Sequence, residues 1–168
     1  EQVRLGQFWQ ILHGSMSEVA GLRDALYQAG LVANQRLAVA GASMGGMTAL
    51  GIMARHPEVS SVACLMGSGY FTSLSKTLFP PQDATEIDAL LAEWEVTRAL
   101  PRLADGPLLL WHGDADDVVP PGETFRLQQA LQREGLDGNL TCLWEAGVRH
   151  RITPAALDAT VDFFRQHL

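Results

Sequence analysis

Three segments of the chain carry residue types that could together perform nucleophilic catalysis. Residues 41–45 read Gly-Ala-Ser-Met-Gly, the G-x-S-x-G form in which a sharp turn between a strand and a helix exposes a serine hydroxyl. Residues 114–117 hold three aspartates, and residues 147–150 end in a histidine. A serine is inert at neutral pH unless a base lies within hydrogen-bond reach and a third group orients that base. The pattern predicts acyl transfer with Ser43 as nucleophile.

His150 is the predicted base, because it lies a few residues beyond an apolar segment and just before a helix start at Thr153-Pro154. His112 is the rival, since it also stands at the end of a predicted strand; we expect its side chain to support the loop instead. The remaining histidines fall on or near helix ends and are interpreted as surface residues: His13, His56 and His167.

The orienting acid is predicted among Asp114, Asp116 and Asp117. The order serine, aspartate, histidine along the chain is that of the α/β-hydrolase triad and differs from the orders of chymotrypsin-like and subtilisin-like proteases. An exposed acidic loop on an acidic protein could look the same, so two of the three aspartates are expected to be ordinary surface groups.

Two other interpretations of the glycine-rich turn are weaker. The first is a glycine-rich helix start that merely permits close packing, which the position of the motif after a strand and before a helix disfavours. A dinucleotide-binding turn fails on spacing, because G-x-G-x-x-G would need glycine at 43 and the G-x-x-x-G-x-G variant would need glycine at 47, where Met47 stands.

Four short apolar runs without polar alternation are predicted as buried parallel strands, near residues 37–41, 61–67, 107–112 and 140–145. Helical patterns alternate with them, which predicts an α/β fold with a parallel sheet covered by helices on both faces. The carboxyl ends of such strands form the ligand-binding edge, and all three catalytic candidates follow strands. Residues 1–168 are interpreted as one domain.

The helices are predicted from apolar spacing and end signals. A single stripe runs from Leu5 to Leu26 on a helix of about 25 residues that stops at Gly30, and further helices cover 47–55 and 121–134. Thr153-Pro154 opens a terminal helix on which four apolar residues share one face: Leu157, Val161, Phe164 and Leu168.

A less regular excursion over about 70–106 follows the second strand, with a helix through Ile87 and Trp94. Because it begins at the catalytic edge, it is expected to fold over that edge like a lid. Four of its residues are expected to line an acyl pocket: Tyr70, Phe71, Leu78 and Phe79.

Composition excludes several classes of function. The 168 residues include 12 Lys+Arg and 19 Asp+Glu, a net charge of −7, which offers no footprint for nucleic acid. Neither a spanning segment nor a secretory leader is expected. Cys64 and Cys142 lie in apolar runs, so reduced thiols and a cytoplasmic location are expected. No cofactor motif or metal ligand set is found, and the oligomeric state is left open.

The segments Gly41 to Gly46, Leu110 to Pro120 and Gly147 to Pro154 resemble the α/β-hydrolase superfamily, among small bacterial carboxylesterases near its dienelactone-hydrolase and prolyl-oligopeptidase-like branches. The resemblance implies that Asp116, the aspartate of H-G-x-x-D-x-x-V-P, is the acid. It also implies that the Met44 N–H is one oxyanion donor. Members have strands before the first helix and a second donor from an early loop, so the chain resembles the C-terminal two thirds of a hydrolase. Losing one oxyanion donor typically lowers the rate by about 10² to 10³. Without the earlier strands of the family, the first predicted strand of this chain would be left as an unpaired edge of the sheet.

The sequence therefore predicts a serine carboxylesterase that hydrolyses small-molecule, short-chain acyl esters through an acyl-enzyme on Ser43. A peptidase or thioesterase on the same fold, or a non-catalytic binding module, remains the alternative.

Overall fold

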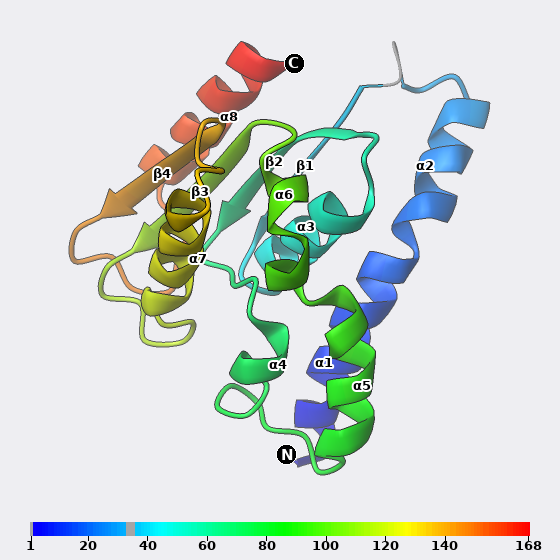
Figure 1. The fold of residues 1–168 in the computed structure, drawn as a ribbon, viewed down its shortest axis with the longest axis vertical. Helices are drawn as coiled ribbons and strands as arrows, with labels where there is room; N and C mark the ends of the chain where they lie inside the picture. The colour runs from blue at the N-terminus through cyan, green and yellow to red at the C-terminus, as the bar shows by residue number, and fades with distance from the viewer. Residues whose placement is uncertain (1, 33–35) are drawn as a thin grey trace.

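Four parallel strands form the single sheet of this structure, a computed structural model that describes residues 2–32 and 36–168, with the backbone alone for residues 2–6. The strands are β1 (Leu37–Ala42), β2 (Val59–Leu65), β3 (Leu108–Gly113) and β4 (Leu140–Glu145), paired in that order. Their ends lie within two residues of the predicted positions. The prediction of a parallel α/β sheet is confirmed (Figure 1).

Helices cover both faces of this sheet because successive strand residues point to opposite sides. Val62 and Leu108 belong to the main core, over which α3 (Met44–Arg55) and α7 (Gly122–Arg133) lie. Their chain neighbours Ala63 and Leu109 pack on the other face against Phe163 of α8 (Pro154–His167). Figure 1 shows α8 behind the sheet and α3 and α7 in front of it. Burial on both sides explains the continuous apolar runs of β2 and β3. The prediction of a buried strand is wrong for β4, where Leu143 and Trp144 are exposed, and β1 is only partly buried.

The predicted single N-terminal helix is wrong, because the chain forms two helices, α1 (Gln2–Ser17) and α2 (Val19–Gln28), that meet at Glu18. The Ser17 hydroxyl donates to the carbonyl of His13 at 2.8 Å, and a serine that bonds back to the preceding turn often bends a helix. The apolar stripe is buried in α1, at Leu12 and Met16, and is lost in α2, which has no buried residue. The side chain of Leu5 lies outside the described residues.

The predicted ends of the helices agree with the structure. Gly30 and Gly135 adopt φ of +68° and +67°, the left-handed conformation that closes a helix. The Thr153 hydroxyl accepts from the N–H of Ala156 at 3.0 Å and caps α8.

The predicted apolar face of α8 turns outward. Leu157 and Val161 are 54% and 47% exposed, while Ala156, Thr160 and Phe163 are the buried residues of the helix. The sheet therefore contacts the neighbouring stripe, and of the predicted face only Phe164 packs beside it, partly buried.

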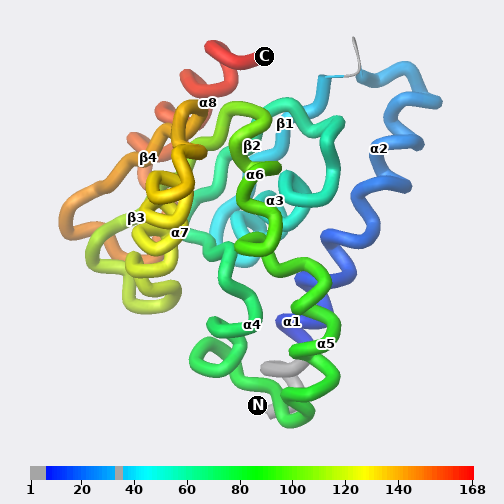
Figure 2. Tube along the Cα trace, viewed as in Figure 1, coloured from blue at the N-terminus to red at the C-terminus, as the bar shows by residue number. Residues whose placement is uncertain are grey.

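The excursion between β2 and β3 contains more helix than its sequence indicated: α4 (Phe71–Leu74), α5 (Ala84–Trp94), η1 (Val96–Ala99) and α6 (Leu100–Leu103). Figure 2 traces it away from the sheet and along α1. The indole N–H of Trp9 donates to the carbonyl of Phe79 at 3.0 Å, and the rings of Phe8 and Phe79 lie 4.9 Å apart. These contacts attach the excursion to the N-terminal helix.

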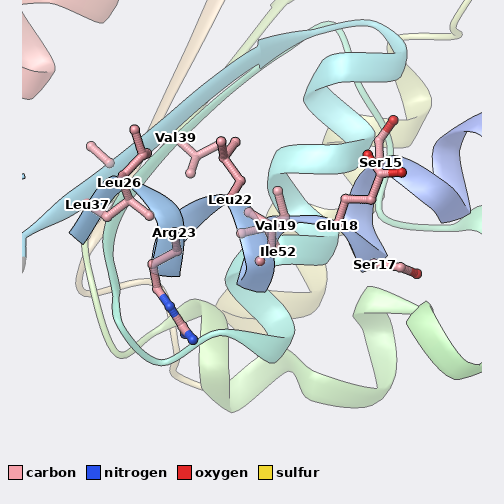
Figure 3. Close-up of a pocket in the computed structure, with 12 residues that line it drawn as sticks. Ser15, Ser17, Glu18, Val19, Leu22, Arg23, Leu26, Leu37, Val39 and Ile52 are labelled. Atoms are coloured by element: carbon pink, nitrogen blue, oxygen red, sulfur yellow. The ribbon is translucent and has the colours of Figure 1, made fainter. Parts of the chain in front are cut away.

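Strand β1 is an edge strand, since within 2–32 and 36–168 no other strand pairs with its outer side. Beside it lies a groove of about 830 Å³ lined by α2 residues such as Leu22 and Leu26, by Leu37 and Val39 of β1, and by Ile52 of α3 (Figure 3). No helix in the described part of the chain is both long enough and apolar enough to cross a membrane.

Candidate active site

Ser43 lies at a strained turn between β1 and α3. Its φ of 55° and ψ of −119° fall outside the regions that side chains usually allow, a conformation that costs on the order of 1–3 kcal/mol. The serine N–H donates to the carbonyl of Leu65 at 2.9 Å, and its own carbonyl accepts from Met47 in the first turn of the helix. The surrounding backbone therefore fixes the position of the serine at the carboxyl end of the sheet.

Crowding around this turn restricts two of its three glycines. A Cβ on Gly41 would lie 2.0 Å from the carbonyl oxygen of Gly45, so glycine is required there. At Gly45 itself a Cβ would meet nothing within 4 Å. The second crowded position is Gly46, where a Cβ would approach the Leu65 carbonyl to 2.9 Å. Within the G-x-S-x-G motif, crowding therefore requires glycine at 41 and not at 45.

Ser43, His150 and Asp116 lie in a hydrogen-bonded row. The Ser43 hydroxyl is 2.9 Å from Nε2 of His150, and Nδ1 of His150 is 2.8 and 3.0 Å from the two carboxylate oxygens of Asp116. Since Nδ1 faces two carboxylate oxygens, it carries a proton, and in the neutral ring Nε2 is free to accept one from the serine. This arrangement places the imidazole within the hydrogen-bond reach that a general base for the hydroxyl requires.

Two loops bring the histidine and the aspartate together. The carboxylate of Asp114 accepts from the N–H of Gly147 at 2.6 Å, and the N–H of Ala115 donates to the carbonyl of Val148 at 3.1 Å. Gly147 takes a φ of +72°, a turn that favours glycine. These bonds between the loops after β3 and β4 explain how residues 34 apart in sequence come into contact.

Asp116 differs from its neighbours in burial. Its side chain has no exposed surface, and Oδ1 accepts from the N–H groups of Val118 and Val119 at 2.9 and 3.0 Å. Asp117 is 46% exposed and pairs with Arg149, and the hydrogen bond from that guanidinium lowers the pKa of Asp117. Of the three candidate aspartates, Asp116 is the one placed against His150.

His112 is fully buried directly behind Asp116, and the sequence did not indicate this contact. Its Nε2 lies 3.1 Å from Oδ2 of Asp116 and 2.9 Å from the carbonyl oxygen of Val119, while its Nδ1 lies 2.7 Å from the hydroxyl of Thr124 on α7. Burial lowers the pKa of His112. The other histidines lie elsewhere, although His56 is not a free surface group, because its Nδ1 is 3.1 Å from a carboxylate oxygen of Glu58.

The predicted oxyanion donor, the N–H of Met44, lies beside Ser43. Met44 is the first residue of α3, so its N–H has no partner within the helix and lies next to the nucleophile.

The predicted pocket residues lie mostly in the core or against α1. Phe71 is fully buried in the main core, and Leu78 packs against the same core, so Phe71 presents no surface to a substrate in this structure. Phe79 packs against α1, as described above. Tyr70, partly buried, remains a predicted pocket residue.

A second polar cluster follows β2 at the same edge. The buried Ser68 hydroxyl donates to Oε2 of Glu123 at 2.6 Å and accepts from the N–H of Tyr70 at 3.0 Å. Arg126 donates to the other oxygen of Glu123 at 2.6 Å and lies over the Tyr70 ring at 4.0 Å. This cluster joins α7 to the start of the excursion, and no sequence signal indicated it.

The groove beside β1 is lined by none of the three catalytic candidates, so it is distinct from the candidate active site. Within the described residues, no group of three or more His, Cys, Asp or Glu side chains could hold a metal ion. Cys64 and Cys142 are free thiols, and burial raises their pKa to about 12 and about 11.

The family model described as the prolyl oligopeptidase family matches residues 13–168, and the chain belongs to this family. By fold and family it is a serine hydrolase of the α/β-hydrolase type. The chain is 59% identical over 174 residues to "Esterase YjfP" of Escherichia coli (strain K12), a match that covers 98% of this chain and 70% of that protein.

Solved structures show the same fold. A puromycin-hydrolyzing peptidase of Mycobacterium tuberculosis superposes with a TM-score of 0.75 at 23% identity, covering 92% of this chain and 25% of that one. Acyl-protein thioesterase 2 of Zea mays gives 0.63 at 23% identity, covering 93% of this chain and 65% of that one. The chain thus spans a quarter of the peptidase and just under two thirds of the thioesterase. At such identities the likeness concerns the fold.

Proposed function

We propose that the chain carries the catalytic triad of a carboxylesterase, with Ser43 as nucleophile, His150 as general base and Asp116 as the acid that orients it. The observation that carries the proposal is the row of contacts from the Ser43 hydroxyl through both nitrogens of His150 to the buried Asp116 carboxylate. The 59% identity to an esterase supports an ester as the substrate.

In the proposed mechanism the Ser43 oxygen attacks the ester carbonyl while His150 takes the hydroxyl proton at Nε2. The Met44 N–H donates to the carbonyl oxygen as negative charge develops on it. Collapse of the tetrahedral intermediate breaks the ester bond, and His150 returns the proton to the leaving alcohol. Water, activated by the same base, then cleaves the acyl-enzyme and releases the acid.

A small-molecule ester with a short acyl group is the proposed substrate. Supporting it, Phe71 is buried in the core and Phe79 packs against α1, which leaves Tyr70 as the predicted pocket residue next to the catalytic edge. The cytoplasm is the proposed compartment, and its support is the pair of free thiols at Cys64 and Cys142.

The direct test uses a phosphonate probe on the full-length protein. We expect one covalent adduct, located by mass spectrometry on Ser43, and loss of both adduct and p-nitrophenyl acetate hydrolysis in Ser43→Ala. Ser68→Ala is the matched control, because Ser68 lies at the same edge but bonds to Glu123. An adduct on Ser68 would refute the assignment, and the absence of any adduct would favour a non-catalytic binding module.

A peptidase is the second candidate, because the family is described by its oligopeptidase members. Comparison of matched p-nitrophenyl ester, thioester and p-nitroanilide substrates separates the classes. We expect the ester to give the highest kcat/KM, and a preference for the anilide would favour the peptidase.

A further inference from the structure

The carboxylate of Asp116 receives hydrogen bonds on both oxygens, and the donors differ in kind. Two backbone N–H groups, of Val118 and Val119, hold Oδ1, whereas a side chain, His112, approaches Oδ2. The side chains of His112 and Asp116 are both without exposed surface. This contact is therefore shielded from bulk solvent.

The contacts of His112 assign its proton. Nε2 faces a carboxylate oxygen and the carbonyl oxygen of Val119, and neither can donate, so Nε2 carries the hydrogen. Nδ1 faces the hydroxyl of Thr124 at 2.7 Å, which can donate to a bare ring nitrogen. The neutral Nε2–H tautomer thus satisfies every contact of the ring.

The surroundings favour this neutral form. The charged or titratable groups that face the ring are Asp116 on the loop after β3 and His150 on the loop after β4. Thr124 of α7 and the ring of Trp144 on β4 also contact it. Burial outweighs the attraction of Asp116 and lowers the pKa of His112, and His150 acts in the same direction.

We propose that His112 is a positioning residue for the hydrolytic reaction, whose neutral Nε2–H holds Oδ2 of Asp116 against the Nδ1–H of His150. The inference rests on the proposed triad. Rotation of an aspartate about its terminal torsion is soft, so donors on Oδ1 alone leave the second oxygen free to turn away. With His112 in place, both oxygens remain within 3.0 Å of the His150 nitrogen.

The test compares two amides at position 112 in the full-length protein. A glutamine amide reaches about as far as Nε2 and can supply its N–H, whereas an asparagine amide reaches only as far as Nδ1. We expect His112→Asn to lower kcat by about 10-fold to 100-fold with KM within about twofold, since a buried acceptor loses its partner. His112→Gln should recover most of the lost kcat.

Controls separate positioning from loss of folding. Rates are divided by the concentration of active sites titrated with the phosphonate, and thermal midpoints are recorded for each variant. His56→Ala removes a histidine–carboxylate contact away from Ser43 and is expected to change stability without changing kcat. In an Asp116→Asn background, the additional loss from His112→Asn should shrink to within about threefold, because His112 acts through Asp116.

Equal kcat in His112→Asn and His112→Gln, after correction for active sites, would overturn the inference, as would full additivity with Asp116→Asn. Failure of the proposed function is distinguishable, because it would show as activity retained in Ser43→Ala. Loss of activity in Ser43→Ala together with unchanged kcat in His112→Asn would reject the positioning role alone.

Discussion

Replacement of Asp116 by asparagine should disable the triad with little change in the fold. Oδ1 of Asp116 accepts from two backbone N–H groups, so the amide oxygen of asparagine must take that side. The NH₂ group is then left facing His150 Nδ1 and His112 Nε2, which both donate in the parent. His150 can form a hydrogen bond with this NH₂ group only if its Nδ1 is the acceptor. The ring proton then moves to Nε2, the atom that must receive the serine proton.

The size of the effect follows from this change of tautomer. The corresponding substitution in serine proteases lowers kcat by about 10⁴, and we expect the same order here. Substrate binding should be preserved, because Asp116 has no exposed surface and cannot touch a substrate. The expected signature is therefore a loss in kcat with KM changed by less than about threefold.

The neighbouring aspartates provide matched controls. In Asp114→Asn the amide oxygen can still accept from the N–H of Gly147, and Asp117 is an exposed partner of Arg149. Each variant should retain kcat within about tenfold of the parent on p-nitrophenyl acetate. A crippled Asp117→Asn with a normal Asp116→Asn would refute the assignment of the acid, and equal mild losses in all three would place the acid elsewhere.

Three further predictions concern the turn, the thiols and the buried histidine. Gly45→Ala should keep activity and a thermal midpoint at or above the parent, whereas Gly41→Ala, with its Cβ 2.0 Å from a carbonyl oxygen, should yield little folded protein in expression trials. Cys64 and Cys142, with pKa values raised to about 12 and about 11, should resist iodoacetamide at pH 8 until urea unfolds the chain, as peptide mass spectrometry would show; labelling of native Cys64 would contradict its burial. Because burial lowers the pKa of His112, its contribution to stability is complete above the unfolded pKa of about 6.5 and is lost as pH falls through the lower folded value. The thermal midpoint should therefore fall more steeply between pH 8 and pH 5 in the parent than in His112→Gln. Parallel curves would argue against a neutral ring.

Local signals in the sequence determined the sheet and the residues at its edge. Runs such as 107–112 lack polar alternation, and only a strand covered on both faces can bury such a run. Glycine at 41 and serine at 43 predicted the turn because few other residues fit a strained strand-to-helix connection. Gly30 and Thr153 predicted helix ends through conformations and bonds that involve only their near neighbours.

Features that depend on contacts between distant segments were decided by the tertiary structure. The apolar stripe through Leu22 looked continuous in the sequence. The chain bends at Glu18, however, and Leu22 is left 60% exposed. The apolar face of α8 at Leu157 was equally regular, yet the sheet packs against the adjacent face of the helix instead. Spacing reports which residues share a face, but the partner surface decides which face is buried.

The same limit applies at the candidate site. The residue types in the loops after the strands predicted a serine, an acid and a histidine at one edge, but three aspartates within four residues were equivalent until a family pattern selected one. The fold distinguishes them physically, because only the 116 carboxylate points inward to His112 and His150 while its neighbours bond across the loop or face solvent. The hydrogen-bond partners of this carboxylate come from its own loop, from the end of β3 and from the loop after β4, a convergence that a linear pattern does not encode.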